Sequence, residues 1–406
     1  MTGSGLSKTG LDRLHELMAG HVEHGGVPGV VTVVSRRGEL HVDAVGTKAA
    51  DGAGGPVQRD TIFRISSMTK PVTAVAAMIL VEEGRLRLDE PVDSWLPELA
   101  DRRVLRAVDS PLDDTVPATR PITVRDVLTF RMGLGMLMVA PGTYPVQREF
   151  AALELGDGPP LPQKPPAPDE WMRRFGTLPL VHQPGEQWTY HISADVLGVL
   201  VARAAGRPFA EFLRERIFDP LEMRDTAFSV PPEKIDRFAT SYVTDPETGG
   251  LMVFDEAAGG QWSSEPAFPS GGGGLVSTAD DFVAFGQMML NHGKLGNERI
   301  LSRRSVETMT TDQLTPQVKA ASAGNFPPGF FDTNSWGFGL GVVTGRANVY
   351  DSVGKYGWDG GLGTCFSSDP SEELVTIQLT QRAWTSPVLP PVAVDFMTAA
   401  YAAIDD

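Results

Sequence analysis

Ser67 and Lys70 lie three positions apart in the S-x-x-K element Ser67-Met68-Thr69-Lys70, at the start of a strongly apolar segment. In a helical turn, residues i and i+3 share a face, so the hydroxyl and the amine would lie within hydrogen-bond reach. An amine in that position takes the hydroxyl proton and turns the serine into a nucleophile. The amino end of the helix would also offer backbone amides and a positive dipole end to an oxyanion. The element therefore predicts acyl transfer on Ser67.

A second S-x-x-K element tests how much the pattern alone means. A chain of this size holds about one such element by chance, and Ser352-Val353-Gly354-Lys355 also matches. It lies among glycines before a strand, where residues i and i+3 do not share a face, so Ser352 is predicted to be a turn residue. For Ser67 the alternative is a helix cap beside a solvated lysine. The helix behind Ser67 is too apolar for a surface helix, which favours the catalytic interpretation.

Hydrophobic periodicity predicts the elements that position this serine. The segment 67–86 is dense in Ala, Val, Met and Leu, which indicates a buried helix. Segments 30–35 and 40–45 predict a β-hairpin. Other predicted helices are 6–23, 124–128, 171–175, 193–205, 209–217, 278–290 and 392–403, and other predicted strands are 336–343, 356–366 and 374–379.

Strands near both ends of the chain, with helices between them, predict an α+β fold. We expect residues 1–80 and 230–406 to build one sheet domain, and residues 81–229 to form a helical lobe. Within that lobe, the Pro-rich segment 141–184 is predicted to be a long loop, since prolines crowd its middle. That loop is either a lid over a cleft or a plain insertion.

Composition excludes several classes of function. The 406 residues include 35 Lys and Arg against 51 Asp and Glu, so the net charge of −16 offers no basic field for nucleic acid or a membrane surface. No apolar run reaches the roughly 18 residues of a membrane span. The single cysteine, Cys365, cannot form an internal disulfide, and the amino-terminal residues resemble no signal peptide, so we expect a cytoplasmic protein.

Two common catalytic devices are also missing from the sequence. No H-E-x-x-H element is present, and His15, His21 and His24 do not have the spacing of a metal site. No G-x-S-x-G elbow is present either, which argues against an α/β-hydrolase triad. We therefore expect neither a metal nor another cofactor.

Several segments in family order resemble the serine β-lactamase and penicillin-binding-protein superfamily, and specifically its class C-like esterase branch, the family VIII carboxylesterases. The resemblance spans most of the chain and implies a β-lactamase/transpeptidase-like fold, an antiparallel sheet flanked by helices with a mostly helical lobe. The segments are Phe63–Pro71, Leu80–Gly84, Leu88–Val92, Pro121–Thr129 and Gly272–Asp281. A departure follows the fourth segment, where Phe130-Arg131-Met132-Gly133-Leu134 replaces the usual His-Thr-Ser-Gly-Leu.

The resemblance implies that Tyr190 is a general base. The second family motif is Tyr-x-Asn, and its best counterpart is Tyr190-His191-Ile192 at the start of a predicted helix. A phenol with a pKa near 10 is a poor base, but an adjacent Lys70 ammonium would favour the phenolate. We assign the removal of the Ser67 proton to Lys70 and Tyr190 jointly. The alternative is a buried aromatic residue at a helix start.

The third family motif, Lys-Thr-Gly on a strand beside the site, corresponds to Trp358-Asp359-Gly360-Gly361. An indole cannot attract the carboxylate that the family lysine binds. Ile192 likewise replaces the motif asparagine, so both positions favour neutral, apolar acyl groups over β-lactams. The Gly361 amide is expected to form the oxyanion hole with the Ser67 amide. The alternative for Trp358 is packing in the core.

Met132 and Met136 belong to an apolar, flexible patch that either lines an acyl pocket or packs in the core. Together these residues predict a carboxylesterase that forms an acyl-enzyme on Ser67 with a small-molecule ester. The same intermediate would serve an acyltransferase, or an amidase or peptidase acting on D-amino-acid amides. A non-catalytic binding protein with the same fold is the remaining alternative.

Overall fold

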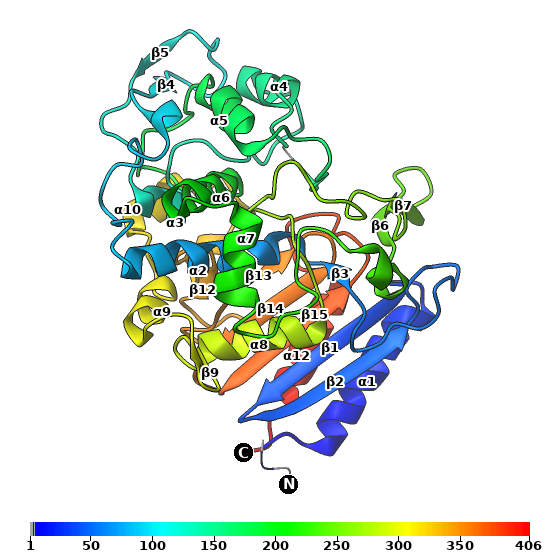
Figure 1. The fold of residues 1–406 in the computed structure, drawn as a ribbon. Coiled ribbons are helices and arrows are strands. Elements are labelled where there is room, and N and C mark those ends of the chain that lie inside the picture. Colours follow the sequence, from blue (N-terminus) through cyan, green and yellow to red (C-terminus); the bar gives the residue numbers. More distant parts are fainter. Residues whose placement is uncertain (1–2, 4, 157) are drawn as a thin grey trace.

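A seven-stranded antiparallel sheet, built from both ends of the chain, carries the fold (Figure 1). The structure is a computed structural model that describes residues 3, 5–156 and 158–406; residues 1, 2, 4 and 157 of the predicted sheet domain and Pro-rich loop lie outside it. Within the described residues the strand order is β11-β12-β13-β14-β15-β1-β2. These strands are β1 (Gly29–Arg36), β2 (Glu39–Gly46), β11 (Asn334–Trp336), β12 (Gly341–Val343), β13 (Tyr356–Gly360), β14 (Thr364–Asp369) and β15 (Leu374–Thr380). The predicted α+β fold with an antiparallel sheet is confirmed.

Short two-stranded ribbons complete the β-structure of the described chain. They pair β3 (Phe63–Arg64) with β8 (Val276–Ser277), β4 (Arg103–Leu105) with β5 (Thr115–Pro117), β6 (Ser241–Thr244) with β7 (Leu251–Asp255), and β9 (Lys294–Leu295) with β10 (Glu298–Arg299). The β3–β8 ribbon matters for the site, because β3 leads directly into the turn that carries Ser67.

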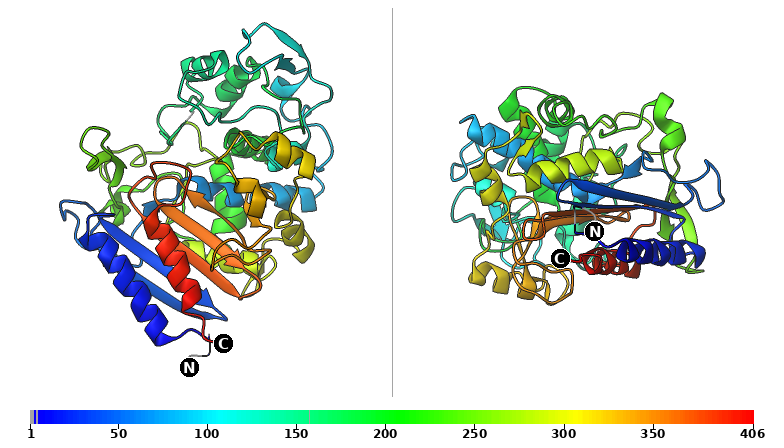
Figure 2. Two further views of the ribbon diagram at one scale, coloured as in Figure 1. Left: turned by 180° about the vertical axis from the view of Figure 1, so that it is seen from behind. Right: turned by 90° about the horizontal axis from the view of Figure 1, so that it is seen from below.

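Helices cover both faces of the sheet (Figure 2). They are α1 (Lys8–Glu23), α2 (Thr69–Glu82), α3 (Val124–Leu128), α4 (Pro145–Ala152), α5 (Pro168–Gly176), α6 (Ile192–Ala205), α7 (Phe209–Leu213), α8 (Ala279–Leu290), α9 (Arg303–Met309), α10 (Pro316–Ala321), α11 (Phe330–Thr333) and α12 (Pro391–Ala402). Shorter turns are the 3-10 helices η1 (Ser66–Met68), η2 (Pro97–Leu99) and η4 (Pro232–Arg237) and the π-helical η3 (Arg214–Phe218). Helices α1 and α12 lie side by side on one face, and α8 lies on the other. Of the helices described, none is long and apolar enough to cross a membrane.

Helix α2 is buried, as its composition predicts. Every residue from Thr69 to Leu80 is buried, and α2 packs against α6 and the end of β13. The 3-10 turn η1 precedes it and carries Ser67, so Ser67 lies at the amino end of a helix enclosed by protein on all sides. Pro71 lies in the first turn of α2, where a missing amide hydrogen costs little.

The predicted long loop over residues 141–184 is wrong in part, because α4 and α5 both lie within it. Each helix begins with a proline, Pro145 and Pro168. At the first helical position proline loses no hydrogen bond and already has a helical φ, so these prolines start helices instead of breaking them. The apolar face of α5, with Trp171 and Phe175, is buried in the lobe.

Two predicted strand runs are each a pair of strands. Residues 336–343 contain a tight turn between β11 and β12, and residues 356–366 contain a turn between β13 and β14. Gly363 has a φ of +109° and its amide donates to the Gly360 carbonyl, so glycines reverse the chain at the second turn. This reversal places Gly361 at the end of β13, beside the turn that carries Ser67.

Candidate active site

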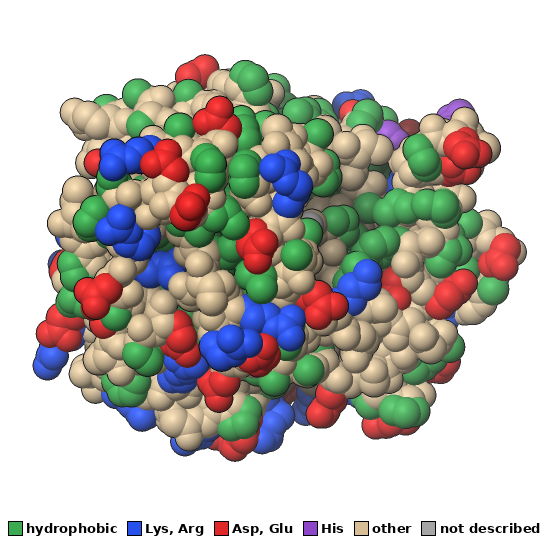
Figure 3. Space-filling view, turned by 90° about the horizontal axis from the view of Figure 1, so that it is seen from above, with side chains coloured by type: hydrophobic (Ala, Val, Ile, Leu, Met, Phe, Trp, Pro, Cys, Tyr) green, Lys and Arg blue, Asp and Glu red, His purple; other side chains and the backbone are tan. Residues whose placement is uncertain are grey.

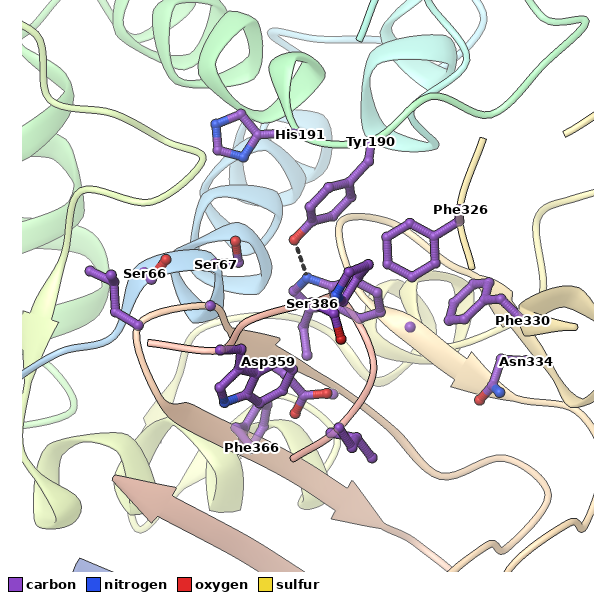
Figure 4. A pocket seen from close by; sticks show the side chains of 18 of the residues that line it. Ser66, Ser67, Tyr190, His191, Phe326, Phe330, Asn334, Asp359, Phe366 and Ser386 are labelled. Atoms are coloured by element: carbon purple, nitrogen blue, oxygen red, sulfur yellow. Dashed lines mark hydrogen bonds between the residues drawn. The ribbon is translucent and has the colours of Figure 1, made fainter. Parts of the chain in front are cut away.

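A cavity of about 610 Å³ opens beside the end of strand β13, between that strand and the segments that carry Ser67 and Tyr190. Seen from above, hydrophobic side chains gather around a hollow in the surface (Figure 3). Ser67, Tyr190 and His191 stand at one end of the cavity (Figure 4). Its apolar wall is formed by Met136, Met138, Phe326, Phe330 and Trp358.

The Ser67 hydroxyl and the Lys70 amine lie in direct contact, with 2.8 Å between Oγ and Nζ. Both side chains come from consecutive helical turns, Ser67 from η1 and Lys70 from the first turn of α2. Ser67 is 8% exposed and faces the cavity, whereas Lys70 is fully buried behind it. Ser67 and His191, which both contact the amine, lie between it and the cavity.

Three groups surround the Lys70 amine. Besides Ser67 they are the Gly272 carbonyl at 2.5 Å and the Nδ1 atom of His191 at 3.1 Å. Burial lowers the pKa of Lys70 to about 7, although the Asp195 carboxylate opposes this shift. A substantial fraction of the amine is then unprotonated near neutral pH and able to accept a proton.

The pKa of the Tyr190 phenol shifts in the direction opposite to the one expected from the sequence. Burial raises the pKa of the Tyr190 phenol above its ordinary value, while hydrogen bonds with Ser67 and Trp358 oppose the rise. The Lys70 amine lies 4.7 Å from the centre of the Tyr190 ring, over its face. The prediction that a Lys70 ammonium makes this phenol a phenolate is therefore wrong, because burial disfavours the charge on both groups.

Trp358 belongs to the site and not to the closed core. Its Nε1 atom donates a hydrogen bond of 2.6 Å to the Tyr190 hydroxyl oxygen, drawn as the dashed line in Figure 4. The indole also packs edge-on against Trp336 at 4.5 Å between ring centres. Trp358 thereby orients the phenol and forms part of the cavity wall.

The Gly361 position has room for a substrate. A Cβ atom on Gly361 would meet nothing within 4 Å, and Gly361 lines the cavity. The neighbouring Gly360 lies so close to the Ile65 carbonyl that a Cβ atom would stand 2.2 Å from it. Thr364 donates to the same carbonyl at 3.1 Å. These contacts hold the end of β13 against the segment that carries Ser67.

Of the three apolar residues predicted to bind the substrate, Met136 lines the cavity, whereas Met132 and Ile192 do not. Met136 lines the cavity, and its amide donates to the Tyr190 carbonyl at 2.8 Å. Met132 is fully buried in the main core, so its predicted role in substrate binding is wrong. Ile192 is 1% exposed and points into the core beside a separate small cavity, so its predicted place in the substrate site is also wrong.

His191 is the site residue that sequence reasoning did not find. The motif comparison placed the Lys70 partner at Ile192, but the backbone turns the side chain of the preceding residue toward the amine. The Nε2 atom of His191 lies 3.6 Å from Asp195, one helical turn further on. The sequence feature that could have indicated this contact is the histidine directly after Tyr190. In the described part of the chain no group of His, Cys, Asp and Glu side chains is arranged to hold a metal ion.

Comparison with known proteins places the chain in a family. The Beta-lactamase family model matches residues 14–389. Protein Rv1367c of Mycobacterium tuberculosis (strain ATCC 25618 / H37Rv) is 40% identical over 360 residues, covering 87% of this chain and 86% of that protein. Esterase EstB of Burkholderia gladioli is 32% identical over 396 residues, covering 92% and 91%.

A solved structure agrees with this placement. The structure of EstCE1, described as a hydrolase with promiscuous acyltransferase activity, has a TM-score of 0.78 and 24% identity, and the match covers 98% of this chain and 99% of that chain. That likeness concerns the fold. On the extent of the family match and the identity to its relatives, this chain belongs to the β-lactamase family.

Proposed function

We propose that this protein is a serine hydrolase that cleaves carboxylic esters through an acyl-enzyme on Ser67. The observation that carries the proposal is the 2.8 Å contact between Ser67 Oγ and a buried amine whose pKa is lowered to about 7. A nucleophile paired with a base of that pKa suits ester chemistry at neutral pH. The relative EstB, an esterase by name and 32% identical, supports the same reaction class.

The lowered pKa of Lys70 and the raised pKa of Tyr190 support the following order of proton transfers. The unprotonated Lys70 amine takes the Ser67 proton as Oγ attacks the ester carbonyl, and the amides of Ser67 and Gly361 hold the resulting oxyanion. Tyr190, whose raised pKa keeps it protonated, gives its proton to the leaving alkoxide, and Lys70 then returns a proton to Tyr190. Water next attacks the acyl-enzyme, releases the acid and restores the Ser67 hydroxyl.

The cavity favours uncharged acyl or alcohol groups. Its wall is rich in aromatic rings and methionines. By the motif resemblance, Trp358 takes the place of the lysine in Lys-Thr-Gly. Asp359 also lines the cavity; burial raises its pKa to about 6, so it remains largely anionic at pH 7. At the Trp358 wall, a carboxylate on the substrate would meet an indole in place of a cation. We therefore expect short neutral esters to react faster than β-lactams.

The decisive experiment combines labelling with turnover. A fluorophosphonate probe should modify the wild type stoichiometrically at Ser67, with the adduct located by mass spectrometry, and p-nitrophenyl butyrate should be hydrolysed. Ser67→Ala should lose both the labelling and the turnover, whereas Ser352→Ala, in the second S-x-x-K element, should keep both. Full esterase activity in Ser67→Ala would refute the proposal.

An acyltransferase is the second candidate, because the same acyl-enzyme can react with an alcohol. The favouring observation is the apolar wall beside Ser67, which would hold an alcohol better than a polar site would. The solved EstCE1 structure is of a hydrolase with promiscuous acyltransferase activity. Product analysis with a competing alcohol separates the two candidates: a transferase yields mainly the new ester, and a hydrolase mainly the free acid.

A further inference from the structure

We propose that His191 is a positioning residue that aims the lone pair of the Lys70 amine at the Ser67 hydroxyl. This inference rests on the proposed function, since it concerns how the base is held. It gives a chemical role to a buried side chain that stands one position before the motif residue expected to contact the lysine.

The hydrogen-bond acceptors around the Lys70 amine decide the direction of its lone pair. A neutral amine has two N–H donors and one lone pair. The Gly272 carbonyl, 2.5 Å from Nζ, can only accept a hydrogen bond, so it takes one N–H. If His191 Nδ1 at 3.1 Å takes the other, the lone pair is left facing Ser67 Oγ at 2.8 Å. Without His191, the amine could turn its lone pair away from the serine.

The surroundings of His191 favour the tautomer that this role requires. Burial lowers the pKa of His191 well below its ordinary value, and the nearby Lys70 charge adds to the effect, so the ring is neutral. Asp195 Oδ2 lies 3.6 Å from Nε2 and favours the hydrogen on that nitrogen. Nδ1 then carries the lone pair that faces Lys70.

Asp195 also holds the second acceptor in place. Its Oδ1 atom accepts hydrogen bonds from the Gly272 amide at 3.0 Å and from the Ser270 hydroxyl at 2.6 Å. One buried carboxylate at the start of α6 therefore lies beside the imidazole and is hydrogen-bonded to the glycine-rich segment whose carbonyl contacts Lys70. The Lys70 amine, His191, Asp195 and Gly272 form a closed ring of contacts.

The backbone at His191 is strained, and the strain serves this contact. His191 has a φ of +80° and a ψ of −70°, and the Ile192 amide donates to the Tyr190 carbonyl at 3.2 Å. This is the γ-turn of positive φ, which is rare and costly for a residue with a side chain. Glycine would adopt it without that cost. A histidine here loses backbone stability, and its side chain reaches the amine of the base.

The test varies the acceptor and the strain separately. His191→Gly removes the acceptor and relieves the turn, His191→Ala removes the acceptor and keeps the strain, and His191→Asn places an amide oxygen near the position of Nδ1 and tolerates positive φ. The readout is the rate of fluorophosphonate labelling of Ser67, with the unfolding temperature as a measure of folding. We expect labelling to fall about 10- to 100-fold in the Gly and Ala variants, as for a buried donor that loses its acceptor, and to stay within about 3-fold in the Asn variant.

Chemical rescue separates a hydrogen-bonding role from a space-filling one. His191 lines the cavity, so a small ring can enter the space left in His191→Gly. Imidazole, which has an acceptor nitrogen, should restore labelling, and pyrrole, which has the same shape and no acceptor, should not; Ser67→Ala with imidazole is the blank. Wild-type labelling rates in both the Gly and Ala variants, equal losses in the Asn variant, or equal rescue by pyrrole would each overturn the inference. If the wild type itself is not labelled at Ser67, the proposed function fails instead.

Discussion

Lys70 and Tyr190 lie against the same hydroxyl, and burial favours the uncharged form of each. The acid–base chemistry should therefore depend on pH through Lys70, whose pKa is about 7. Protonation below that pH removes the base, so kcat/KM for p-nitrophenyl butyrate should fall as the pH drops through about 7 and level off above it. A profile that stays flat from about pH 5 to 9 would contradict Lys70 as the base.

Trp358 offers a second test at the scale of a single residue. Trp358→Phe keeps an aromatic wall but removes the hydrogen bond of 2.6 Å to the Tyr190 oxygen. The loss of one such bond should lower kcat about 2- to 12-fold, with a smaller change in KM. Phe326→Leu is the control for packing, because its ring lies 5.5 Å from that of Tyr190 and 6.1 Å from that of Trp358 but takes no part in that bond. An unchanged kcat in Trp358→Phe would show that the indole only fills space.

At the scale of elements, a buried ion pair anchors the strand that leads into Ser67. The Arg64 guanidinium, in β3, bonds to Asp255 of β7 at 2.5 and 2.8 Å, and both side chains are almost fully buried. Arg64 also lies over the Phe238 ring at 3.9 Å. The pair therefore ties the segment before the nucleophile to the β6–β7 ribbon.

Breaking this pair should be costly, because it leaves a buried guanidinium without its counter-charge. Asp255→Ala should lower the free energy of unfolding by about 3–5 kcal/mol, as measured by urea denaturation. The matched control is Asp280→Ala, which removes the partner of Arg59 in an exposed pair of 2.7 Å and should cost about 0–1 kcal/mol. Similar losses in the two variants would show that burial of the first pair does not matter.

At the scale of the whole molecule, the sheet separates a structural layer from the catalytic layer. Helices α1 and α12 pack on one face around a core of their own, and the Ser67 turn and α8 lie on the other (Figure 2). Because α1 and α12 come from opposite ends of the chain, this face of the sheet is covered only when both helices are in place.

Substitutions in the core between α1 and α12 should lower the free energy of unfolding without changing kcat. Leu14→Ala removes a fully buried side chain of α1 and should lower the free energy of unfolding by about 2–5 kcal/mol. Leu17→Ala, on the same helix but 39% exposed, should cost far less. Both variants should keep the wild-type kcat at temperatures where they are folded. A large loss of kcat in folded Leu14→Ala would contradict the separation of the two layers.

The parts of the fold that local patterns control were predictable. Helix α2, the β1–β2 hairpin and the terminal helices follow hydrophobic periodicity, which is written in consecutive residues. Helix α4 was not predicted, and α5 was predicted only over residues 171–175, because a proline starts a helix as readily as it breaks one and the difference depends on the tertiary environment. The paired strands at 336–343 and 356–366 were read as single runs because their turns are short.

For this protein, the sequence by itself determined the contact between Ser67 and Lys70, since a helical turn places residues three positions apart on one face whatever surrounds it. It also determined the α+β architecture through the order of its apolar patterns. Only the tertiary structure decided the direction of the pKa shifts of Lys70 and Tyr190, the burial of Met132 and Ile192, and the place of His191. Those properties depend on desolvation and on a strained backbone turn, and both arise only when distant segments pack together.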